Sequence, residues 1–397
     1  DMSQPTTGNQ ETRLQGLVNA NGESNRTRYA LEWKKRGGKV IGLLCPYVPE
    51  EVVHAAGMLP WRITGTWQED VSLAAAYRPR NLDLYCTHVL QSFLAGELDF
   101  LDGVVISNYD DDRRRLADVL VHLNRLPLVH IMHLPHLDSE LGYQAFARSI
   151  KKLISDLEQL GGVTISEESM RQAITLNNET RTLLSGLYSL RKRDVPPLSG
   201  SEVLGIVTAA SVMPKEVFNR DLKSLLDFLV GRQAPLARFR PRLLVSSTAL
   251  DNPAYLDLIE GLGSVVAMDD LDTGSRYFWS TVDEEQDPIS ALARRYISRP
   301  PCPRMFFWDK QVERVISWAR EFNIDGVLHL PQMYDYPRWF GVPYFERKMK
   351  EAGIPIMTFL REYHFTNVGQ MKTRVQAFIE ATRERRQPSA LNARGEQ

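Results

Sequence analysis

The sequence predicts an α/β protein with two flavodoxin-like lobes, each built from a parallel sheet with flanking helices. Two observations lead to this prediction. Short apolar runs bounded by glycine, proline or charged residues recur along the chain, as is typical of buried parallel strands. Amphipathic stretches with helical spacing separate these runs. Parallel strands joined by helices need crossover connections, so the helices are expected to cover the sheets.

The first expected lobe covers residues 36–198 and contains four apolar runs. They predict strands at residues 40–44, 58–64, 102–106 and 128–132. A helix is expected at 50–57, and apolar residues at helical spacing predict another from 146 onward. Ser166, followed by two glutamates, is a helix N-cap signal for a third.

The second expected lobe covers residues 199–386 and begins at the Pro-Pro-Leu-Ser-Gly stretch that ends at Gly200. Its predicted strands are residues 242–246, 264–268, 326–330 and 355–359. A polar N-terminal extension, 1–35, and a polar tail, 387–397, flank the two lobes. The length of 397 residues suits two or three domains.

Composition excludes several classes of protein. A formal net charge of −1 argues against nucleic acid as the main partner. The three cysteines, Cys45, Cys86 and Cys302, are too few for a disulfide scaffold and favour a reducing compartment. No run approaches the roughly 18 apolar residues that span a bilayer, so a cytoplasmic protein with no membrane contact is expected. The Gly-Gly-Lys at 37–39 lacks the frame of a phosphate-binding loop.

Two segments, 101–112 and 324–335, share an Asp-Gly-Val opening and an acidic ending. Ligands of parallel sheets bind beyond the carboxyl ends of the strands, which is where Asp110 and Asp335 fall. The favoured interpretation of the acidic run 110–112, which precedes three arginines, is nonetheless a solvated helix face. The carboxylates at Asp110, and those within 269–272, keep a second interpretation as ligands of hard cations or as acid–base groups.

Histidines and cysteines give weaker signals. The histidines at 130, 133 and 136 are flanked by prolines and are interpreted as a strand and its exit turn rather than a metal site. Cys302, between two prolines, and Cys45, at a strand end, are interpreted as packed thiols. Cys86 precedes a helical stretch, and both core packing and an activated or metal-bound thiolate remain open for it.

Six sequence blocks along the chain carry a family resemblance. The first is Pro-Tyr-Val-Pro-Glu-Glu-Val-Val-His-Ala-Ala-Gly-Met-Leu-Pro at 46–60. The others are residues 100–105, 196–213, 269–278, 325–327 and 352–355. In this order the blocks resemble the benzoyl-CoA reductase/2-hydroxyacyl-CoA dehydratase family, and the resemblance covers roughly residues 36–385.

The resemblance implies a subunit of a heteromeric, oxygen-sensitive enzyme of anaerobic metabolism. It implies a homologous second subunit, a separate ATP-hydrolysing activator that donates a low-potential electron, and a CoA-thioester substrate. It also implies a [4Fe–4S] cluster held by three cysteines.

The sequence departs from the family at those cysteines. The cluster positions of the family fall at Asp83, Asp110 and Asp335, with Cys86 one helical turn from the first. A further family cysteine is replaced by Asp272. Hard carboxylates are poor ligands for iron–sulfur centres, so the alternatives are no cofactor or a divalent metal. The metal-ligand candidates are Cys86, Asp110 and Asp335, and the aspartates are expected to converge between the lobes.

Three hypotheses follow. The preferred one is an acyl-CoA reductase or dehydratase subunit using single-electron chemistry, with an unusual cluster or its partner's cluster. The stretch 58–60 favours aromatic, benzoyl-CoA-type reduction over 2-hydroxyacyl-CoA dehydration. The second is a clusterless acyl-CoA-binding or scaffolding subunit, and the third is a divalent-metal-dependent non-redox enzyme. By its match to a family glutamate, Glu51 is the candidate for acid–base chemistry or substrate positioning, against a plain helix-start carboxylate.

Overall fold

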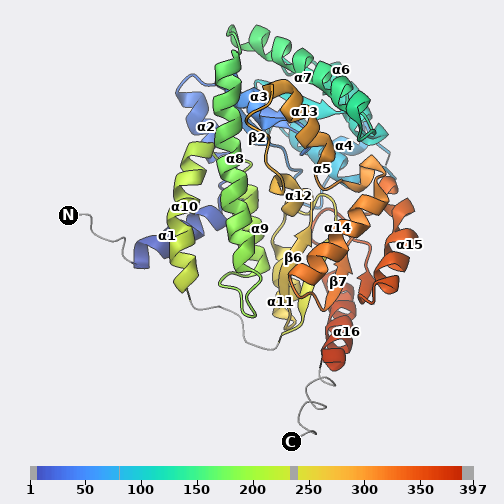
Figure 1. Ribbon diagram of the computed structural model, residues 1–397. Coiled ribbons are helices and arrows are strands. Elements are labelled where there is room, and N and C mark those ends of the chain that lie inside the picture. Colours follow the sequence, from blue (N-terminus) through green and yellow to red (C-terminus); the bar gives the residue numbers. More distant parts are fainter. Residues whose placement is uncertain (1–6, 80, 233–239, 387–397) are drawn as a thin grey trace, which may run out of the picture.

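The computed structural model describes residues 7–79, 81–232 and 240–386, and it contains two parallel four-stranded sheets in two lobes (Figure 1). The strand orders are β2-β1-β3-β4 and β6-β5-β7-β8. The first sheet consists of β1 (Val40–Leu43), β2 (Leu59–Arg62), β3 (Gly103–Ser107) and β4 (Val129–Met132). The second consists of β5 (Arg242–Ser246), β6 (Val265–Asp270), β7 (Gly326–His329) and β8 (Ile356–Thr358). The predicted α/β class with two flavodoxin-like lobes is confirmed.

The two sheets repeat one topology. Strands β3 and β7 occupy the same place in their sheets, and each follows the Asp of an Asp-Gly-Val opening. The carboxylate of Asp102 accepts a hydrogen bond of 2.8 Å from the backbone N–H of Val40. The carboxylate of Asp325 accepts one of 2.8 Å from the backbone N–H of Arg242. The sequence echo therefore marks a repeated structural unit in which this aspartate ties the third strand to the first.

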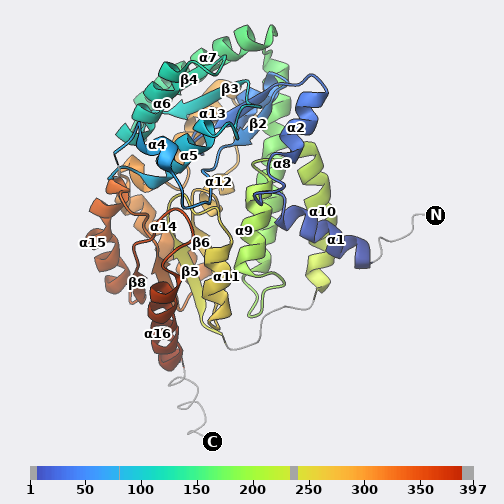
Figure 2. The same ribbon diagram turned by 180° about the vertical axis from the view of Figure 1, so that it is seen from behind.

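Helices cover both sheets (Figures 1 and 2). Those of the first lobe are α3 (Glu50–Ala55), α4 (Ser72–Ala75), α5 (Leu84–Leu94), α6 (Asp111–Leu123) and α7 (Glu140–Gly161). Three helices lie between the sheets in sequence: α8 (Glu167–Leu190), α9 (Gly200–Ala209) and α10 (Lys215–Gly231). Those that follow β5 are α11 (Ala254–Gly261), α12 (Ser275–Phe278), α13 (Pro288–Ser298), the 3-10 turn η1 (Pro303–Met305), α14 (Trp308–Glu321), α15 (Tyr336–Glu351) and α16 (Val368–Arg386).

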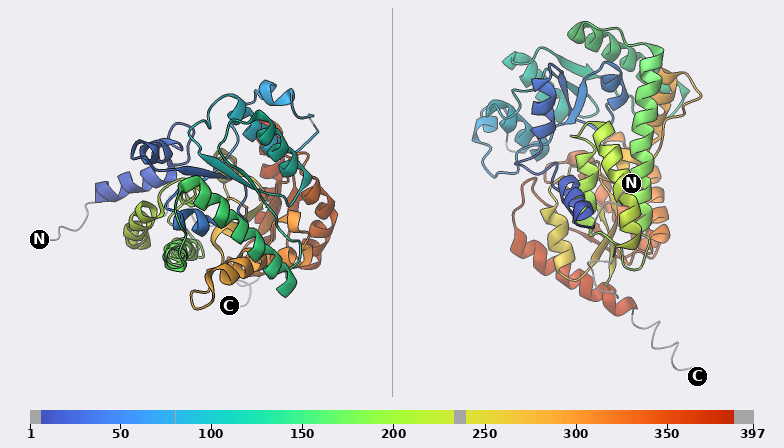
Figure 3. Two further views of the ribbon diagram at one scale, coloured as in Figure 1. Left: turned by 90° about the horizontal axis from the view of Figure 1, so that it is seen from above. Right: turned by 90° about the vertical axis from the view of Figure 1, so that its left-hand side faces the viewer.

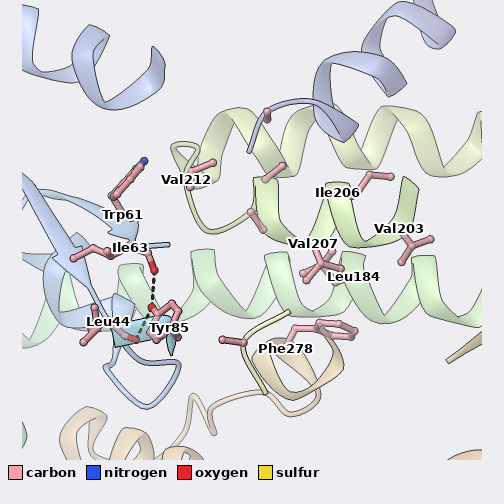
Figure 4. Close-up of a cluster of buried hydrophobic side chains, with 14 of the residues drawn as sticks. Leu44, Trp61, Ile63, Tyr85, Leu184, Val203, Ile206, Val207, Val212 and Phe278 are labelled. Atoms are coloured by element: carbon pink, nitrogen blue, oxygen red, sulfur yellow. Dashed lines mark hydrogen bonds between the residues drawn. The ribbon is translucent and has the colours of Figure 1, made fainter. Parts of the chain in front are cut away.

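The two lobes share a hydrophobic core. One cluster joins Trp61 and Ile63 of the first lobe to Leu184 of α8 and Phe278 of α12 (Figure 4). Within it, the hydroxyl of Tyr85 donates to the backbone carbonyls of residues 44 and 63, at 3.2 and 2.8 Å. Helix α13, from the second half of the chain, packs against α7 of the first lobe. The chain thus interlaces the lobes, and the predicted domain boundaries stay a prediction.

The N-terminal segment folds onto the second half of the chain. Within the expected polar extension, α1 (Thr7–Val18) and α2 (Arg28–Lys35) are helical, and α1 packs against α9 and α10 through buried Leu14 and Leu17 (Figure 3). The predicted cap of α8 is confirmed, since the Ser166 side chain accepts a 3.0 Å bond from the Ser169 N–H. The expected tail, 387–397, lies outside the described residues. Among those described, no helix is long and apolar enough to cross a membrane.

Candidate functional site

Three aspartates at the starts of three helices meet between the lobes. Asp83 is the N-cap residue of α5, Asp110 of α6 and Asp335 of α15. Asp83 and Asp110 accept bonds of 3.3 and 2.8 Å from the backbone N–H groups of residues 86 and 113. The side chains of the three aspartates are 1%, 9% and 0% exposed. Helix N-termini carry partial positive charge, which favours carboxylates at these positions. The aspartates at the family's cluster positions thus converge between the lobes, as the sequence predicts.

Two arginines fill the space between these carboxylates. Arg304 of η1 places Nη2 2.6 Å from Asp83 Oδ2 and 3.0 Å from Asp335 Oδ2, and Nε 2.8 Å from Asp110 Oδ2. Arg113 of α6 places Nη1 3.0 Å from Asp83 Oδ2 and 2.7 Å from Asp110 Oδ2. Both arginines are buried. We call these five residues the interlobe network, because Arg304 joins carboxylates from both lobes.

Neutral side chains complete the contacts of the interlobe network. The hydroxyl of Thr248 donates to Asp335 Oδ2 at 2.7 Å. The side-chain amide of Gln332 donates to Asp83 Oδ1 at 3.1 Å. Oδ1 of Asp335 has no hydrogen-bond partner among the described residues. Asp335 is therefore the least satisfied carboxylate of the network.

Burial and ion pairing act in opposite directions on these groups. Burial opposes ionisation of Asp83, but the guanidinium groups of Arg113 and Arg304 outweigh it and hold the pKa of that carboxyl below its usual range. Of the two arginines, Asp335 pairs with Arg304 alone, so burial prevails and raises the pKa of its carboxyl. Despite burial, the surrounding acidic groups hold the pKa values of both arginines well above the ordinary value. The two guanidinium groups are thus permanently charged.

The three cysteines are buried and free. Burial raises the pKa of the Cys86 thiol far above its ordinary value, and that of Cys302 to about 12. The Cys302 thiol donates to Asp272 Oδ2 at 3.3 Å. The interpretation of Cys45 and Cys302 as packed residues is confirmed. Cys86 is equally buried and packs in the hydrophobic core, which favours the core-packing alternative for that residue.

The residues at the cluster positions do not fit a [4Fe–4S] cluster. Such clusters are bound by thiolates, whereas this site offers three hard carboxylates, and the flanking thiols of Cys86 and Cys302 are packed in the hydrophobic core. All three carboxylates are engaged by guanidinium groups. In the part of the chain that the structure describes, no group of three or more histidine, cysteine or acidic residues is arranged to hold a metal ion. The ligand set Cys86, Asp110 and Asp335 stays a prediction.

A second buried charge cluster begins at Glu50, the first residue of α3. Its carboxylate lies 2.7 Å from Nζ of Lys215 and 3.3 Å from Nη2 of Arg62, and it accepts a 2.9 Å bond from the Tyr277 hydroxyl. Burial raises the pKa of Glu50, but Lys215 and Arg62 prevail and lower it to about 2. Lys215 is itself buried and lies 2.6 Å from the Tyr277 hydroxyl.

Glu51, the candidate catalytic residue, extends this cluster. Its side chain is fully buried, pairs with Arg181 and accepts a 2.8 Å bond from the Tyr296 hydroxyl. Burial opposes its ionisation, but Arg181 prevails and lowers the pKa of the carboxyl. We call Glu50, Glu51, Arg62, Arg181, Lys215, Tyr277 and Tyr296 the α3 network. Its contacts fix the Glu51 carboxylate, and the role of that group stays a prediction.

The acidic segment 269–272 and the histidine at 130 make ion pairs and hydrogen bonds within the fold. Asp270 pairs with Arg276, and Asp272 lies 3.0 Å from the Nε atom of the same arginine. His130 lies in β4, and its Nδ1 is 2.8 Å from Asp156 Oδ2. This contact agrees with the interpretation of that histidine as part of a strand.

A cavity of about 470 Å³ opens between the lobes beside the interlobe network. Its lining includes Arg78, Thr87, His88, Met333, Tyr334 and His364. Burial lowers the pKa of His88 to about 4, so this imidazole is neutral near pH 7. Arg78 lies 2.7 Å from Asp112, whose carboxylate accepts a 3.2 Å bond from the backbone N–H of Asp83. The wall of the cavity also contacts the network directly, because the hydroxyl of Thr87 donates to the backbone carbonyl of Asp83 at 3.2 Å.

Sequence reasoning missed the cations of both networks. The charged run 110–115 is predicted to be a solvated helix face. This is correct for the exposed side chains at 111, 114 and 115, but wrong for Asp110 and Asp112, whose carboxylates pair with buried arginines. Arg113 is instead turned inward, because it lies one helical turn from Asp110. Lys215 and Arg304 come from segments far along the chain, and no local pattern marks them. The sole sequence signal for Arg304 is its place after the rigid Pro-Cys-Pro loop.

Comparison with known proteins identifies relatives along almost the whole chain. Residues 45–382 match the family described as "2-hydroxyglutaryl-CoA dehydratase, D-component". The chain is 24% identical to the (R)-phenyllactyl-CoA dehydratase beta subunit of Clostridium sporogenes, covering 90% of this chain and 95% of that protein. It is 25% identical to one of the subunits of benzoyl-CoA reductase from Thauera aromatica, covering 86% and 90%. It is 24% identical to the beta subunit of (R)-2-hydroxyglutaryl-CoA dehydratase of Acidaminococcus fermentans, covering 88% and 94%.

Proposed function

The chain belongs to the 2-hydroxyglutaryl-CoA dehydratase D-component family, and from that premise we propose that it is one subunit of a heteromeric enzyme that acts on a CoA thioester. The observation that carries the proposal is the match across both lobes to subunits of acyl-CoA dehydratases and of a benzoyl-CoA reductase. In this proposal the enzyme also requires a homologous second subunit, and a separate ATP-hydrolysing activator delivers low-potential electrons.

The proposed chemistry is single-electron activation of the thioester carbonyl. Reduction follows when a second electron and protons are added, whereas dehydration follows when the 2-hydroxyl leaves as hydroxide, a β-proton is lost and the added electron is returned to its donor. The Met-Leu-Pro stretch at 58–60 favours the aromatic, benzoyl-CoA-type reduction. Relatives of both kinds lie at 24–25% identity, so the choice between the two reactions depends on assay.

Within this function we assign Glu51 a positioning role. A general acid or base needs contact with the group that it protonates or deprotonates. The Glu51 carboxylate is instead enclosed by Arg181 and Tyr296. This arrangement supports a role in orienting α3 and Tyr296 rather than in proton transfer. The third hypothesis, a divalent-metal non-redox enzyme, is less favoured because guanidinium groups already occupy the aspartates that it requires.

Reconstitution under anaerobic conditions tests the proposed function. The full chain is purified with its copurifying homologous subunit and supplied with activator, ATP and either benzoyl-CoA or an (R)-2-hydroxyacyl-CoA. We expect turnover that requires both subunits, with benzoyl-CoA preferred. Turnover of the hydroxyacyl thioester alone would reverse the preference. Full activity of the partner and activator without this chain would contradict the proposal.

A further inference from the structure

We infer that the interlobe network is a permanent ionic bridge that takes the place of an iron–sulfur cluster, so that this chain has no redox centre of its own. The inference concerns this chain alone and holds whether or not the proposed function is correct. Where the proposed function also holds, electrons must reach the substrate through a centre in the partner subunit.

The position of Arg304 is the first reason. The residues at the three cluster positions come from both lobes, and the contacts of Arg304 reach all of them within 3.0 Å. A cluster bound at these positions would have to occupy the space between the same three side chains. The guanidinium group already lies there, with Arg113 beside it on two of the three carboxylates.

Charge is the second reason. Three buried carboxylates are tolerated because two guanidinium groups lie among them, and a buried ion that loses its partner is strongly destabilising. Entry of a metal centre would require Arg304 to leave or to remain buried beside added positive charge. Thiolates would compensate such a centre, but the cluster positions carry aspartate, and the thiols of Cys86 and Cys302 are packed in the hydrophobic core. The aspartates at the cluster positions therefore depend on the two arginines, which supply the counter-charges that these buried carboxylates need.

The rigidity of the loop that carries Arg304 is the third reason. The backbone N–H of Cys302 donates to the Tyr47 hydroxyl at 3.0 Å, which ties the loop to the first lobe. The Cys302 thiol ties it to Asp272 of the second lobe. Pro303 restricts the backbone immediately before Arg304. Arg304 is thus fixed in place from both sides and is not a surface side chain folded inward by chance.

Iron and acid-labile sulfide analysis of the isolated full chain tests this inference. The chain is purified anaerobically and incubated with ferrous iron, sulfide and thiol, then desalted. We expect no stoichiometric iron or sulfide, no brown absorption and no paramagnetic signal after dithionite reduction. About four iron and four sulfide per chain, lost in Cys86→Ser, would overturn the inference. The same stoichiometry retained in Cys86→Ser would overturn it as well, by assigning the cluster to the aspartates.

Hydrogen exchange tests the bridging role without any metal. In Arg304→Gln we expect loss of amide protection at the starts of α5, α6 and α15 together, with partial recovery in Arg304→Lys. Loss confined to the 302–306 loop would contradict a bridge between the lobes. If Arg304→Gln does not fold, the iron analysis of the unmodified chain still decides the inference. A chain without iron that is dispensable for turnover contradicts only the proposed function, and an iron-loaded chain that supports turnover contradicts only this inference.

Discussion

The interlobe network and the α3 network are both buried charge clusters, but their charge balance is opposite. In the interlobe network, three carboxylates share two guanidinium groups. In the α3 network, two carboxylates face three cations and also receive phenol hydroxyl groups. The interlobe network therefore has fewer cations than carboxylates, whereas the α3 network has more cations than carboxylates. From this difference we expect that loss of one cation destabilises the interlobe network more than the α3 network.

Removal of Arg304 should have the largest effect. Arg304→Met leaves Asp335 without its ion-pair partner and Asp83 and Asp110 with Arg113 alone. We expect a loss of about 3–5 kcal/mol in the free energy of unfolding, measured by urea denaturation. Arg114→Met is the matched control, because its exposed pair with Asp111 should contribute under about 1 kcal/mol. Equal losses in the two variants would refute the importance given to Arg304.

Removal of Lys215 should cost less than removal of Arg304. In Lys215→Met the Glu50 carboxylate keeps Arg62 and the Tyr277 hydroxyl as partners. The expected loss is about 1–3 kcal/mol, the typical cost of depriving a buried polar group of one partner. The comparison between the two networks fails if Lys215→Met is the more destabilised of the two variants in the same urea experiment.

Acid should weaken the α3 network through its carboxylates, whose pKa values are lowered in the folded protein. The pKa of Glu50 is lowered from 4.5 to about 2 in the folded protein, with Lys215 and Arg62 overcoming the opposing effect of burial. A lowered carboxyl pKa contributes stability that is fully present above pH 4.5 and is lost as the pH falls from 4.5 to 2. Asp83 has the same sign. We expect Glu50→Gln to flatten the dependence of unfolding free energy on pH in this window, and an unchanged slope would contradict the ion pairing of Glu50.

The smallest effect is expected in an experiment that needs no substitution, the alkylation of the three cysteines in the folded protein. All three cysteines are buried, and burial raises the pKa values of Cys86 and Cys302. Thiolates are the reactive form, so alkylation at pH 8 should be slow for all three in the native state and fast after denaturation. Mass spectrometry of the labelled chain measures this. Rapid native labelling of Cys86 would show an accessible thiolate and would reopen the metal-ligand hypothesis.

The sequence was sufficient for the strands and for one half of the site. The strand starting at Val40 and the other seven apolar runs all overlap strands of the structure, because buried parallel strands are short and mostly apolar. Asp110 and Asp335 could be placed together because they follow equivalent strands of a repeated sheet. Arg304 and Lys215 could not be placed, since their partners lie far away in sequence and only tertiary packing brings them together.

A crystal structure of the anaerobically purified chain, with anomalous diffraction recorded at the iron absorption edge, tests the central claim most directly. We predict no anomalous peak between the lobes, and density for the Arg304 guanidinium in contact with the carboxylates of Asp83, Asp110 and Asp335. An iron peak within bonding distance of Cys86 or of these carboxylates, with Arg304 displaced, would contradict the claim that an ionic bridge has replaced the cluster.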